Sequence, residues 1–558
     1  MIKRVAIAAV LAALFFLANR GAYRSFFFGD DLDNLAWTGP VPGERFVRAV
    51  VSPVYTANNF RPTGHGLYHL WSQTAGLWFP AYVGTIQALH LLNALLLFWL
   101  LRRVGSGEWQ AAVGAVAWMF HMALFGAFWR PMYVFDVLCG LFALLALLAW
   151  TGQRWVLAFV CFWLAVKSKE HAVLLPAVLF LYEWTLGQKR WKPLVPFVLA
   201  SFGIGLQGVF ANRAAGADYK LVFSPASVLA TAWTYAKQFW FVALLFAFGA
   251  RREDRGVWWG AGWFAMLLAP MLVLPGRVNP VYLYVPLMGL AAAIALMITA
   301  RARVAWVAAL MIAWLAGNFL WMRELRRAEL TLAGENRAYF EGLARVGPAL
   351  AEPELYIYDG YPQGLDWWGI SGAVRLITGR AEARMAPVQA DDLKAQAEGK
   401  AVMQLFWDPV QRTLATHVRS ANYPELALLD MGLYVPFWQL EEGWHKQEGG
   451  YRWSKPHAEV SLMRPAGAAR FELRVNIGPG HIAKVKPVRV RVRVDGEDLG
   501  EAVFDKQGWQ TVGWTVGPKP AGRVRAVLDV SPPFHPGETD PRVLGVAVGS
   551  IGYPDSRR

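Results

Sequence analysis

The sequence has very little cysteine and little charge for its length. Only two cysteines occur among 558 residues, Cys139 and Cys161, and both lie inside apolar runs. This excludes a disulfide framework and a cysteine metal site. Charged residues make up 17% and apolar residues 56% of the chain, and the mean hydropathy is +0.29. Such a balance is too apolar for a soluble enzyme and predicts a polytopic membrane protein.

Two processing signals are also missing. The sequence contains no Asn-x-Ser/Thr sequon, which favours a bacterial protein. No small-residue cleavage site follows the apolar stretch after Lys3 and Arg4. We therefore expect an uncleaved first transmembrane helix rather than a secretory signal peptide.

Positive charge is present in excess, with a net charge of +15. A strongly basic protein can bind nucleic acid. Many of these Lys and Arg residues instead flank apolar segments, where they set the orientation of a membrane protein. We expect membrane lipids, and no nucleic acid, among the partners.

Eleven apolar segments are predicted to span a membrane. They lie at about residues 4–20, 82–101, 109–128, 132–150, 154–167, 171–187, 194–211, 228–249, 256–274, 281–300 and 304–321. With the N-terminus in the cytoplasm, every cytoplasmic turn is basic, as in Arg102-Arg103. The long first loop, 21–81, and everything after about residue 322 then face outward. We place the chain in a bacterial cytoplasmic (inner) membrane with a periplasmic C-terminal part.

The C-terminal third changes its pattern twice. Residues 323–440 begin with a charged helical segment and then mix short apolar runs with helical stretches, which predicts a linker helix and a small α/β region. Residues 441–558 follow a period of two, as in Val488–Val494, which predicts a β-sandwich. The expected fold is thus a polytopic α-helical membrane domain, residues 1–322, followed by a soluble domain. The alternating arginines predict a solvated sheet face, with a surface for glycan or anionic lipid as the alternative.

Three carboxylates open the first outer loop, Asp30, Asp31 and Asp33. Carboxylates at a membrane boundary are costly to desolvate, so they need a partner, a metal or a reaction. The predicted topology places them on the same face as Arg61, Arg130 and Lys169. A carboxylate that takes a proton from a hydroxyl, together with fixed positive charge on a departing phosphate, is what transfer from a phosphate leaving group requires.

These residues resemble the GT-C superfamily of membrane glycosyltransferases, which use polyprenyl- or dolichyl-phosphate-linked sugars. The resemblance is greatest to the protein O-mannosyltransferase-like branch that includes the tetratricopeptide-containing transmembrane mannosyltransferases. Five pieces within about residues 20–300 carry it: Asp30-Asp31, Arg61-Pro62 followed by Gln87–Ala94, Arg130…Asp136, Lys169-Glu170 followed by Tyr182-Glu183, and Tyr282–Gly289. Asn279-Pro280-Val281 stands where the family often has Glu-Arg, so Arg277 is the candidate replacement, and no tetratricopeptide array follows.

The resemblance implies an inverting glycosyltransferase that moves a sugar from a polyprenyl phosphate to a hydroxyl of a protein, glycan or lipid. Asp30 and Asp31 would supply the general base, with a divalent metal (Mg or Mn) bound by this pair as an open alternative. Arg130 and Lys169 would approach the donor phosphate, with Glu170 orienting them and Arg61 as a further contact. The supporting positions are Asp33, His65, Asp136, Arg277, Tyr282 and Tyr284.

Structural explanations compete with these roles. Asp30 and Asp31 could cap a helix or pair with nearby arginines, Lys169 and Glu170 could pair with each other, and Tyr282 and Tyr284 could be interface aromatics. Two other functions also stay open. A flippase or transporter of a lipid-linked glycan would need polar residues buried in mid-span and repeat symmetry, which the sequence does not show. A non-catalytic scaffold that binds glycan would tolerate substitution of the Asp pair.

Overall fold

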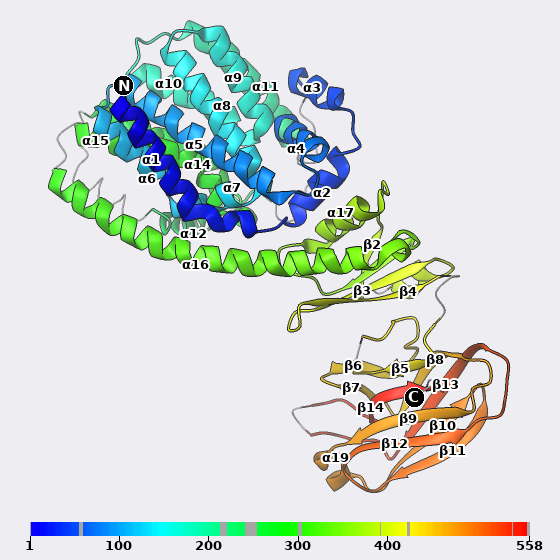
Figure 1. Ribbon diagram of the computed structural model, residues 1–558. Coiled ribbons are helices and arrows are strands. Elements are labelled where there is room, and N and C mark those ends of the chain that lie inside the picture. The colour runs from blue at the N-terminus through cyan, green and yellow to red at the C-terminus, as the bar shows by residue number, and fades with distance from the viewer. Residues whose placement is uncertain are drawn as a thin grey trace. The chain divides into compact units, whose positions relative to one another are not determined.

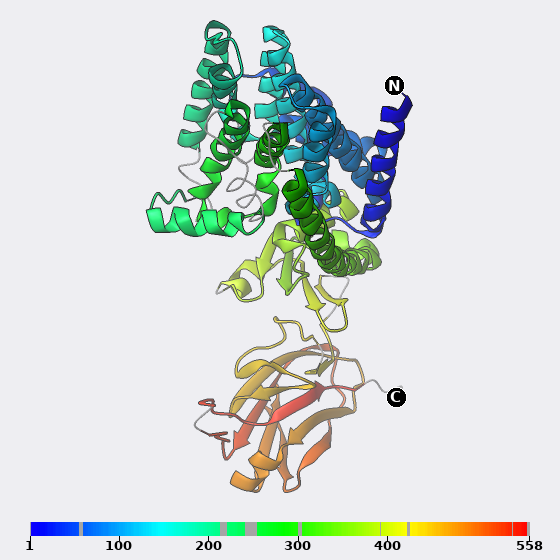
Figure 2. The same cartoon turned by 90° about the vertical axis from the view of Figure 1, so that its left-hand side faces the viewer.

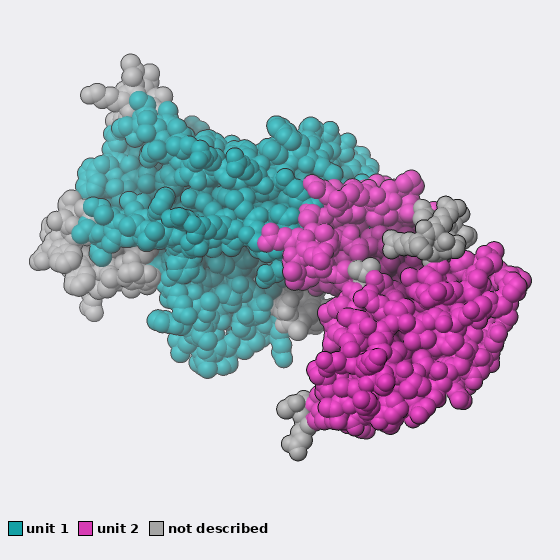
Figure 3. All heavy atoms as spheres, turned by 60° about the horizontal axis from the view of Figure 1, so that its bottom comes forward, with its two compact units in different colours: residues 1–337, 363–376 teal, residues 338–362, 377–558 magenta. Residues whose placement is uncertain are grey.

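A computed structural model describes residues 2–54, 60–211, 220–239, 254–299, 304–390, 392–420, 425–432, 434–537 and 540–554. The chain divides into two compact units (Figure 3). One contains residues 1–337 and 363–376, and the other contains residues 338–362 and 377–558. Parts of the predicted span 228–249 and of the predicted first loop 21–81 lie outside the described residues.

The first unit is helical (Figure 1). Its helices are α1 Ile2–Asn19, α2 Gly29–Thr38, α3 Gly43–Val51, α4 Pro62–Thr74, α5 Phe79–Arg103, α6 Glu108–Met119, α7 Phe125–Trp129, α8 Val134–Thr151, α9 Trp155–Ser168, α10 Leu175–Thr185, α11 Val195–Ala211, α12 Pro225–Ala236, α14 Arg255–Leu272, α15 Pro286–Thr299, most of α16 Val304–Arg345 and most of α17 Asp366–Thr378. The apolar N-terminal part of the sequence therefore forms helices, as predicted.

Three segments among the described residues are long and apolar enough to cross a membrane, namely Ala6–Arg24, Phe79–Arg103 and Pro131–Thr151. The helices Glu108–Met119 and Met122–Trp129, bent by 50° at their junction, make a fourth if they count as one span. Trp155–Ser168 and Pro286–Ile298 are apolar but shorter. Eleven spans therefore remain a prediction.

Helix α16 contains both the predicted last span and the charged segment that follows it. It runs without a break for 42 residues (Figure 2). The predicted last span, 304–321, and the charged segment after residue 323 are one helix, because no proline or glycine cap interrupts the pattern between them.

The core of the helical unit brings two segments of the family resemblance together. Asn93 Nδ2 of α5 donates to the hydroxyl of Tyr284 at 3.0 Å, and His90 Nδ1 lies 2.9 Å from the same oxygen. All three side chains are buried. Tyr284 therefore holds α5 against the segment that precedes α15. The interpretation of Tyr284 as an interface aromatic is wrong, because its polar tip is satisfied inside the protein rather than at a wet boundary.

The second unit begins with a four-stranded sheet of order β2-β1-β3-β4. Its strands are β1 Leu355–Asp359, β2 Met385–Pro387, β3 Val402–Asp408 and β4 Thr413–Arg419, and the short helix α18 Leu393–Ala397 precedes β3. β1 is parallel to both β2 and β3, whereas β4 is antiparallel to β3. The apolar runs at 355–358 and 401–406 thus lie in the neighbouring parallel strands β1 and β3, with helical segments between them in the chain, as in a small α/β region.

The rest of this unit forms two sheets, one of order β11-β10-β13-β8 and one of order β12-β9-β14-β7-β6 with β5 beside β14. The bounds are β5 Leu428–Asp430, β6 Trp444–Glu448, β7 Tyr451–Ser454, β8 His457–Arg464, β9 Arg470–Ile477, β10 Val488–Val494, β11 Glu497–Phe504, β12 Gly508–Thr515, β13 Gly522–Ser531 and β14 Ala547–Gly552, with helix α19 Pro479–Lys484 between β9 and β10. Val490 of β10 and Val475 of β9 share one buried core. The two sheets pack face to face, as the period of two predicted.

The alternating arginines of β10 point away from that core. Arg489 pairs with Glu501 at 2.8 Å, and Arg493 pairs with Asp529 at 2.6 Å. These partners sit on the neighbouring strands β11 and β13. Cross-strand carboxylates thus offset the positive charge, an arrangement that favours a solvated face.

Candidate active site

The acidic motif forms the first turn of α2. The backbone N–H of Phe28 donates to Asp31 Oδ2 at 2.9 Å. A carboxylate three positions into a helix satisfies a donor that the helix itself leaves unpaired, and the helix dipole favours its charge there. The structural alternative of a helix cap therefore holds for Asp31.

Asp30 and Asp31 lie in opposite surroundings. Asp31 is fully buried, and the hydroxyl of Tyr68 donates to its Oδ1 at 2.6 Å. Burial raises the pKa of Asp31 to about 7, although the hydrogen bonds from Tyr68 and Phe28 favour its ionised form. Asp30 is exposed. Because both oxygens of Asp31 accept hydrogen bonds within the protein, Asp30 is the carboxylate of the pair that a substrate can reach.

Helix α17 packs directly on this turn. A Cβ at Gly369 would lie 2.4 Å from the Cα of Gly29, and one at Gly372 would lie 2.6 Å from the backbone nitrogen of Asp33. Both distances are too short for any side chain, so the two helices meet backbone to backbone. From the sequence, this segment is expected in the α/β region between residues 323 and 440. The Gly-x-x-Gly spacing is the signal that could have indicated a helix packed against another backbone.

Two side chains of α17 reach the acidic residues. The indole N–H of Trp368 donates to Asp30 Oδ1 at 2.8 Å. Arg375 forms an ion pair with Asp33. Burial raises the pKa of Asp33, while the charge of Arg375 works in the opposite direction. Asp33 therefore anchors α17, and its supporting role in the reaction stays a prediction.

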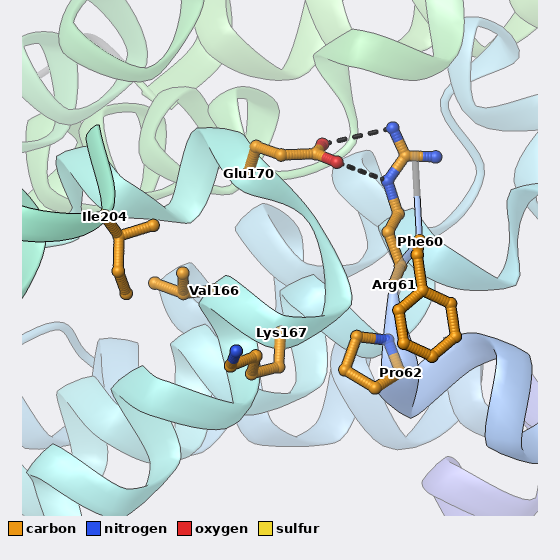
Figure 4. Close-up of a pocket in the computed structure, with 7 residues that line it drawn as sticks. All are labelled: Phe60, Arg61, Pro62, Val166, Lys167, Glu170 and Ile204. Carbon is orange, nitrogen blue, oxygen red and sulfur yellow. Dashed lines mark hydrogen bonds and ion pairs between the residues drawn. The ribbon is translucent and has the colours of Figure 1, made fainter. Parts of the chain in front are cut away.

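The predicted phosphate cation Arg61 is paired with Glu170. Arg61 Nε and Nη2 donate to the two carboxylate oxygens of Glu170 at 2.9 and 3.1 Å (Figure 4). Burial alone would raise the pKa of Glu170, and the Arg61 guanidinium outweighs it, so the pKa lies below its ordinary value. The pair borders a cavity of about 30 Å³, with room for about one water molecule. Lys167 also lines this cavity.

Arg130 makes a similar fork with Glu329 of α16. Its Nε lies 2.9 Å from both carboxylate oxygens, and its Nη2 lies 2.6 Å from Oε2. The guanidinium also stacks on the ring of Phe28, 4.0 Å from the ring centre. Arg130 therefore stands beside the acidic turn, where its charge favours ionisation of Asp31. Glu329 was missed because nothing in its local pattern distinguishes it from the other charges of that helix.

Lys169 pairs with Asp136, and not with its neighbour Glu170. Its Nζ lies 2.5 Å from both carboxylate oxygens of Asp136 and 4.7 Å from the ring centre of Tyr282. The alternative of a Lys169–Glu170 ion pair is therefore wrong. Adjacent residues at the end of a helix point in different directions, so each finds its partner on another element.

His65 has a structural partner on each ring nitrogen. Its Nδ1 accepts from the backbone N–H of Arg61 at 2.9 Å, so its Nε2 carries the proton and faces Asn34 Oδ1 at 3.2 Å. Burial lowers the pKa of His65 to about 3. His65 is therefore neutral near pH 7 and holds the start of α4. Arg277, another of the supporting residues, is half-buried in the 3₁₀ turn η8, Pro275–Arg277.

Metal binding by Asp30 and Asp31 stays a prediction, because a carboxylate oxygen that accepts one hydrogen bond keeps a second lone pair for a cation. Both oxygens of Asp31 accept hydrogen bonds from the protein, and one oxygen of Asp30 accepts from Trp368. Among the described residues, no three His, Cys, Asp or Glu side chains gather closely enough to hold a metal ion.

The cations differ in what they can still bind. The side chains of Arg61 and Arg130 are 20% and 25% exposed, whereas Lys169 is 9% exposed. Each arginine uses Nε and Nη2 on its carboxylate, so its Nη1 points elsewhere. A phosphate oxygen suits the unused edge of the Arg61 guanidinium, whereas Arg130 also interacts with the side chain of Tyr133. The side chains of Arg61 and Arg130 are thus more accessible to an anionic group than that of Lys169.

Comparisons with known proteins give a limited likeness. No protein-family model and no curated protein matches the chain. Among solved structures it is similar to ArnT from Cupriavidus metallidurans bound to undecaprenyl phosphate, with 16% identity and a TM-score of 0.43 over 75% of this chain and 98% of that one. It is also similar to the arabinofuranosyltransferase AftD from Mycobacteria, with 12% identity and a TM-score of 0.42 over 98% of this chain and 60% of that one.

A third structure is the arabinosyltransferase EmbB from Mycobacterium smegmatis, with 12% identity and a TM-score of 0.32 over 98% of this chain and 64% of that one. These three are GT-C glycosyltransferases, and the comparisons do not single out the protein O-mannosyltransferase-like branch. At these identities and TM-scores, the likeness assigns neither a family nor an activity to this chain.

Proposed function

We propose that this chain is a membrane glycosyltransferase that transfers a sugar from a polyprenyl-phosphate-linked donor to a hydroxyl group, with Asp30 as the general base. The observation that carries the proposal is the contrast within the acidic pair. Asp30 is exposed and held by the indole of Trp368, while the adjacent Asp31 is buried with both oxygens engaged. One carboxylate is open to substrate, and its neighbour fixes the turn that carries it.

The reaction follows from this arrangement. Asp30 accepts the proton of the acceptor hydroxyl as its oxygen attacks the anomeric carbon from the side opposite the phosphate. The bond between the anomeric carbon and the phosphate oxygen breaks, and polyprenyl phosphate leaves with the bonding electrons. The configuration at the anomeric carbon is inverted.

Arg61 and Arg130 would stabilise the charge that builds on the departing phosphate. Their pairing with Glu170 and Glu329 holds each guanidinium in place before substrate binds, so little reorganisation is needed in the transition state. Lys169, locked to Asp136, would position this part of the site rather than contact the phosphate. Asp31 is likewise a positioning residue.

The membrane setting is part of the proposal. Three helical segments long enough to cross a membrane support it, and so do the basic residues between the apolar segments. We propose eleven spans, a cytoplasmic N-terminus and a periplasmic site in a bacterial inner membrane.

The test is a complementation experiment. A strain that lacks the gene receives the wild-type protein, Asp30→Asn, or the control Asp505→Asn, which alters an exposed carboxylate of the β-sandwich. Mass spectrometry of glycans, glycolipids and glycoproteins identifies the product. We expect Asp30→Asn to lower product formation by roughly 10²–10⁴-fold at equal expression, and Asp505→Asn to have no effect.

A product level unchanged in Asp30→Asn would rule out the base. If the product depends on the protein and not on Asp30, while undecaprenyl-linked glycan accumulates on the cytoplasmic side of the null strain, a flippase is the better explanation.

A further inference from the structure

The first turn of α17 presents two adjacent indoles at the surface of the helical unit. Trp367 is 49% exposed and Trp368 is 36% exposed. Their ring centres lie 5.8 Å apart, with the ring planes at 83°. An indole is a large apolar surface that folding normally buries. Two that stay open side by side mark a place where another molecule gains by covering them.

Acidic groups stand next to these rings. Trp368 donates its N–H to Asp30, and Asp366 precedes the two tryptophans in the chain. The pKa of Asp366 is raised, first by burial and then by the charge of Asp30, so the two carboxylates are close enough to affect each other. Asp366 also has φ = +56°, a left-handed conformation that Asp tolerates better than most residues. The chain thus turns sharply at Asp366 to start the helix here.

This surface is held rigidly against the proposed base. Gly369 and Gly372 bring the backbone of α17 into contact with the first turn of α2. Arg375 pairs with Asp33 one turn further along. The indoles and the Asp30 carboxylate therefore keep a fixed relation, which a substrate that must present one hydroxyl to one base requires.

We propose that the first turn of α17 is the acceptor subsite, and that the acceptor is an uncharged carbohydrate. A pyranose ring has a face of C–H groups that packs on the exposed indole of Trp367, while its hydroxyls donate to the carboxylates of Asp366 and Asp30. This inference rests on the proposed function and adds the class of acceptor to it. Trp368 sets the direction of Asp30, so it is a positioning residue.

The chemistry of the subsite argues against other acceptors. Two carboxylates would repel a phosphorylated or acidic headgroup. They would also have to lose their hydration beside a lipid tail, which is costly. A sugar has an apolar C–H face that can pack on an indole ring. It also has several hydroxyl groups that can donate hydrogen bonds to the carboxylates.

The test uses the full-length protein in lipid nanodiscs, with maltotetraose, chitotetraose and mannotetraose as probes in saturation-transfer NMR. The variants are Trp367→Ala, Trp367→Phe and the control Trp509→Ala, which removes an exposed indole of the β-sandwich. We expect one probe to bind about tenfold more weakly to Trp367→Ala, to recover in part with Trp367→Phe, and to be unaffected by Trp509→Ala. In complemented cells, Trp367→Ala should lower the modified fraction of that glycan.

The subsite would be overturned if the wild type and Trp367→Ala bound the oligosaccharide probes equally well. It would also be overturned if no probe bound and Trp367→Ala cells had unchanged glycans. A third contrary result would be the new sugar appearing on a Ser or Thr of a protein. The proposed function fails separately. If Asp30→Asn leaves the glycans unchanged while Trp367 still controls probe binding, α17 is a glycan-binding site without transfer. If transfer depends on Asp30 and not on Trp367, only the subsite is wrong.

Discussion

The helical unit and the β-sandwich both contain ion pairs between basic side chains and carboxylates. One such pair is exposed on the sandwich, and another is buried in the helical unit. On the sandwich, the side chains of Arg489 and Glu501 are 50% and 34% exposed. In the helical unit, Lys169 and Asp136 are 9% and 1% exposed. Water screens an exposed pair, so it contributes about 0–1 kcal/mol. Removing one partner of a buried pair costs about 3–5 kcal/mol, because the other charge is left without compensation.

The pairs also differ in what they connect. Arg489 and Glu501 are matched by the register of neighbouring strands. Arg130 and Glu329 are 199 residues apart in the chain, and Arg61 and Glu170 are 109 apart. The ion pairs of the sandwich therefore lie on the surface of a sheet whose strands are already aligned by their backbone register. Those of the helical unit join separate helices around the acidic turn, so the same residue types can serve as solvated surface in one region and as positioning groups in the other.

The largest effect is expected from breaking the most buried pair. Lys169→Met leaves Asp136 charged and unpaired, which should destabilise the folded protein by roughly 3–5 kcal/mol. Thermal denaturation of the detergent-purified protein would show it. The double variant Lys169→Met/Asp136→Asn should recover most of the loss. A single variant as stable as the wild type would mean that this pair behaves like those on the sandwich.

The next effect comes from Asp31. Because its folded pKa of about 7 lies above the value of about 3.9 in an unfolded chain, the folded state keeps the proton to higher pH. The stabilisation is full below about pH 4 and is lost as pH rises through 7, a change of roughly 2–4 kcal/mol. The melting temperature should fall over this range, and Asp31→Asn should flatten the slope. An unchanged slope would refute the raised pKa.

A smaller effect is expected where a pair is partly exposed. Arg375→Ala removes the ion pair that ties α17 to Asp33 and should cost about 1 kcal/mol. Hydrogen–deuterium exchange should become faster in 366–378 and stay unchanged in α5. The matched control is Arg327→Ala, which removes a more exposed pair with Glu324 in α16. Equal exchange in both variants would show that glycine packing alone holds α17.

The smallest effect is expected on the sandwich. Arg491 lies 3.9 Å from Asp498, and both side chains are exposed. Arg491→Ala should change stability by less than about 0.5 kcal/mol. Denaturant titration of the full-length protein would measure the free energy of unfolding. A larger loss would mean that exposed pairs on the sandwich contribute as much to stability as the partly buried pairs of the helical unit.

Local pattern was enough to anticipate several elements. The alternation in 488–494 predicts a strand with buried valines, and β10 is such a strand. The apolar run from Pro131 predicts a long helix, and this segment is one of those able to cross a membrane. In the strand, the period of two separates the buried face from the exposed face. In the helix, the length of the apolar run indicates an apolar environment.

The candidate site was only partly predictable. The sequence singled out Arg61, Arg130, Lys169, Glu170 and Asp136, but it did not predict which carboxylate pairs with which cation. It missed Glu329, Trp368 and Arg375 altogether. Asp30 and Trp368 are separated by 338 residues. Periodicity and capping rules relate residues within a few positions of each other, so they cannot predict a contact over such a separation. The sequence also gives no reason to choose Glu329 among the charged residues of α16.

By itself, the sequence determined that the chain has an apolar helical part and a β-rich part, with an acidic motif directly after the first apolar segment. These follow from composition and from short-range periods. The tertiary structure decided which of two adjacent aspartates is open, which carboxylate neutralises each cation, and that α17 returns from the C-terminal third to cover the acidic turn. The physical reason is that burial and ion pairing depend on which surfaces meet, and those surfaces come from segments that are far apart in the chain.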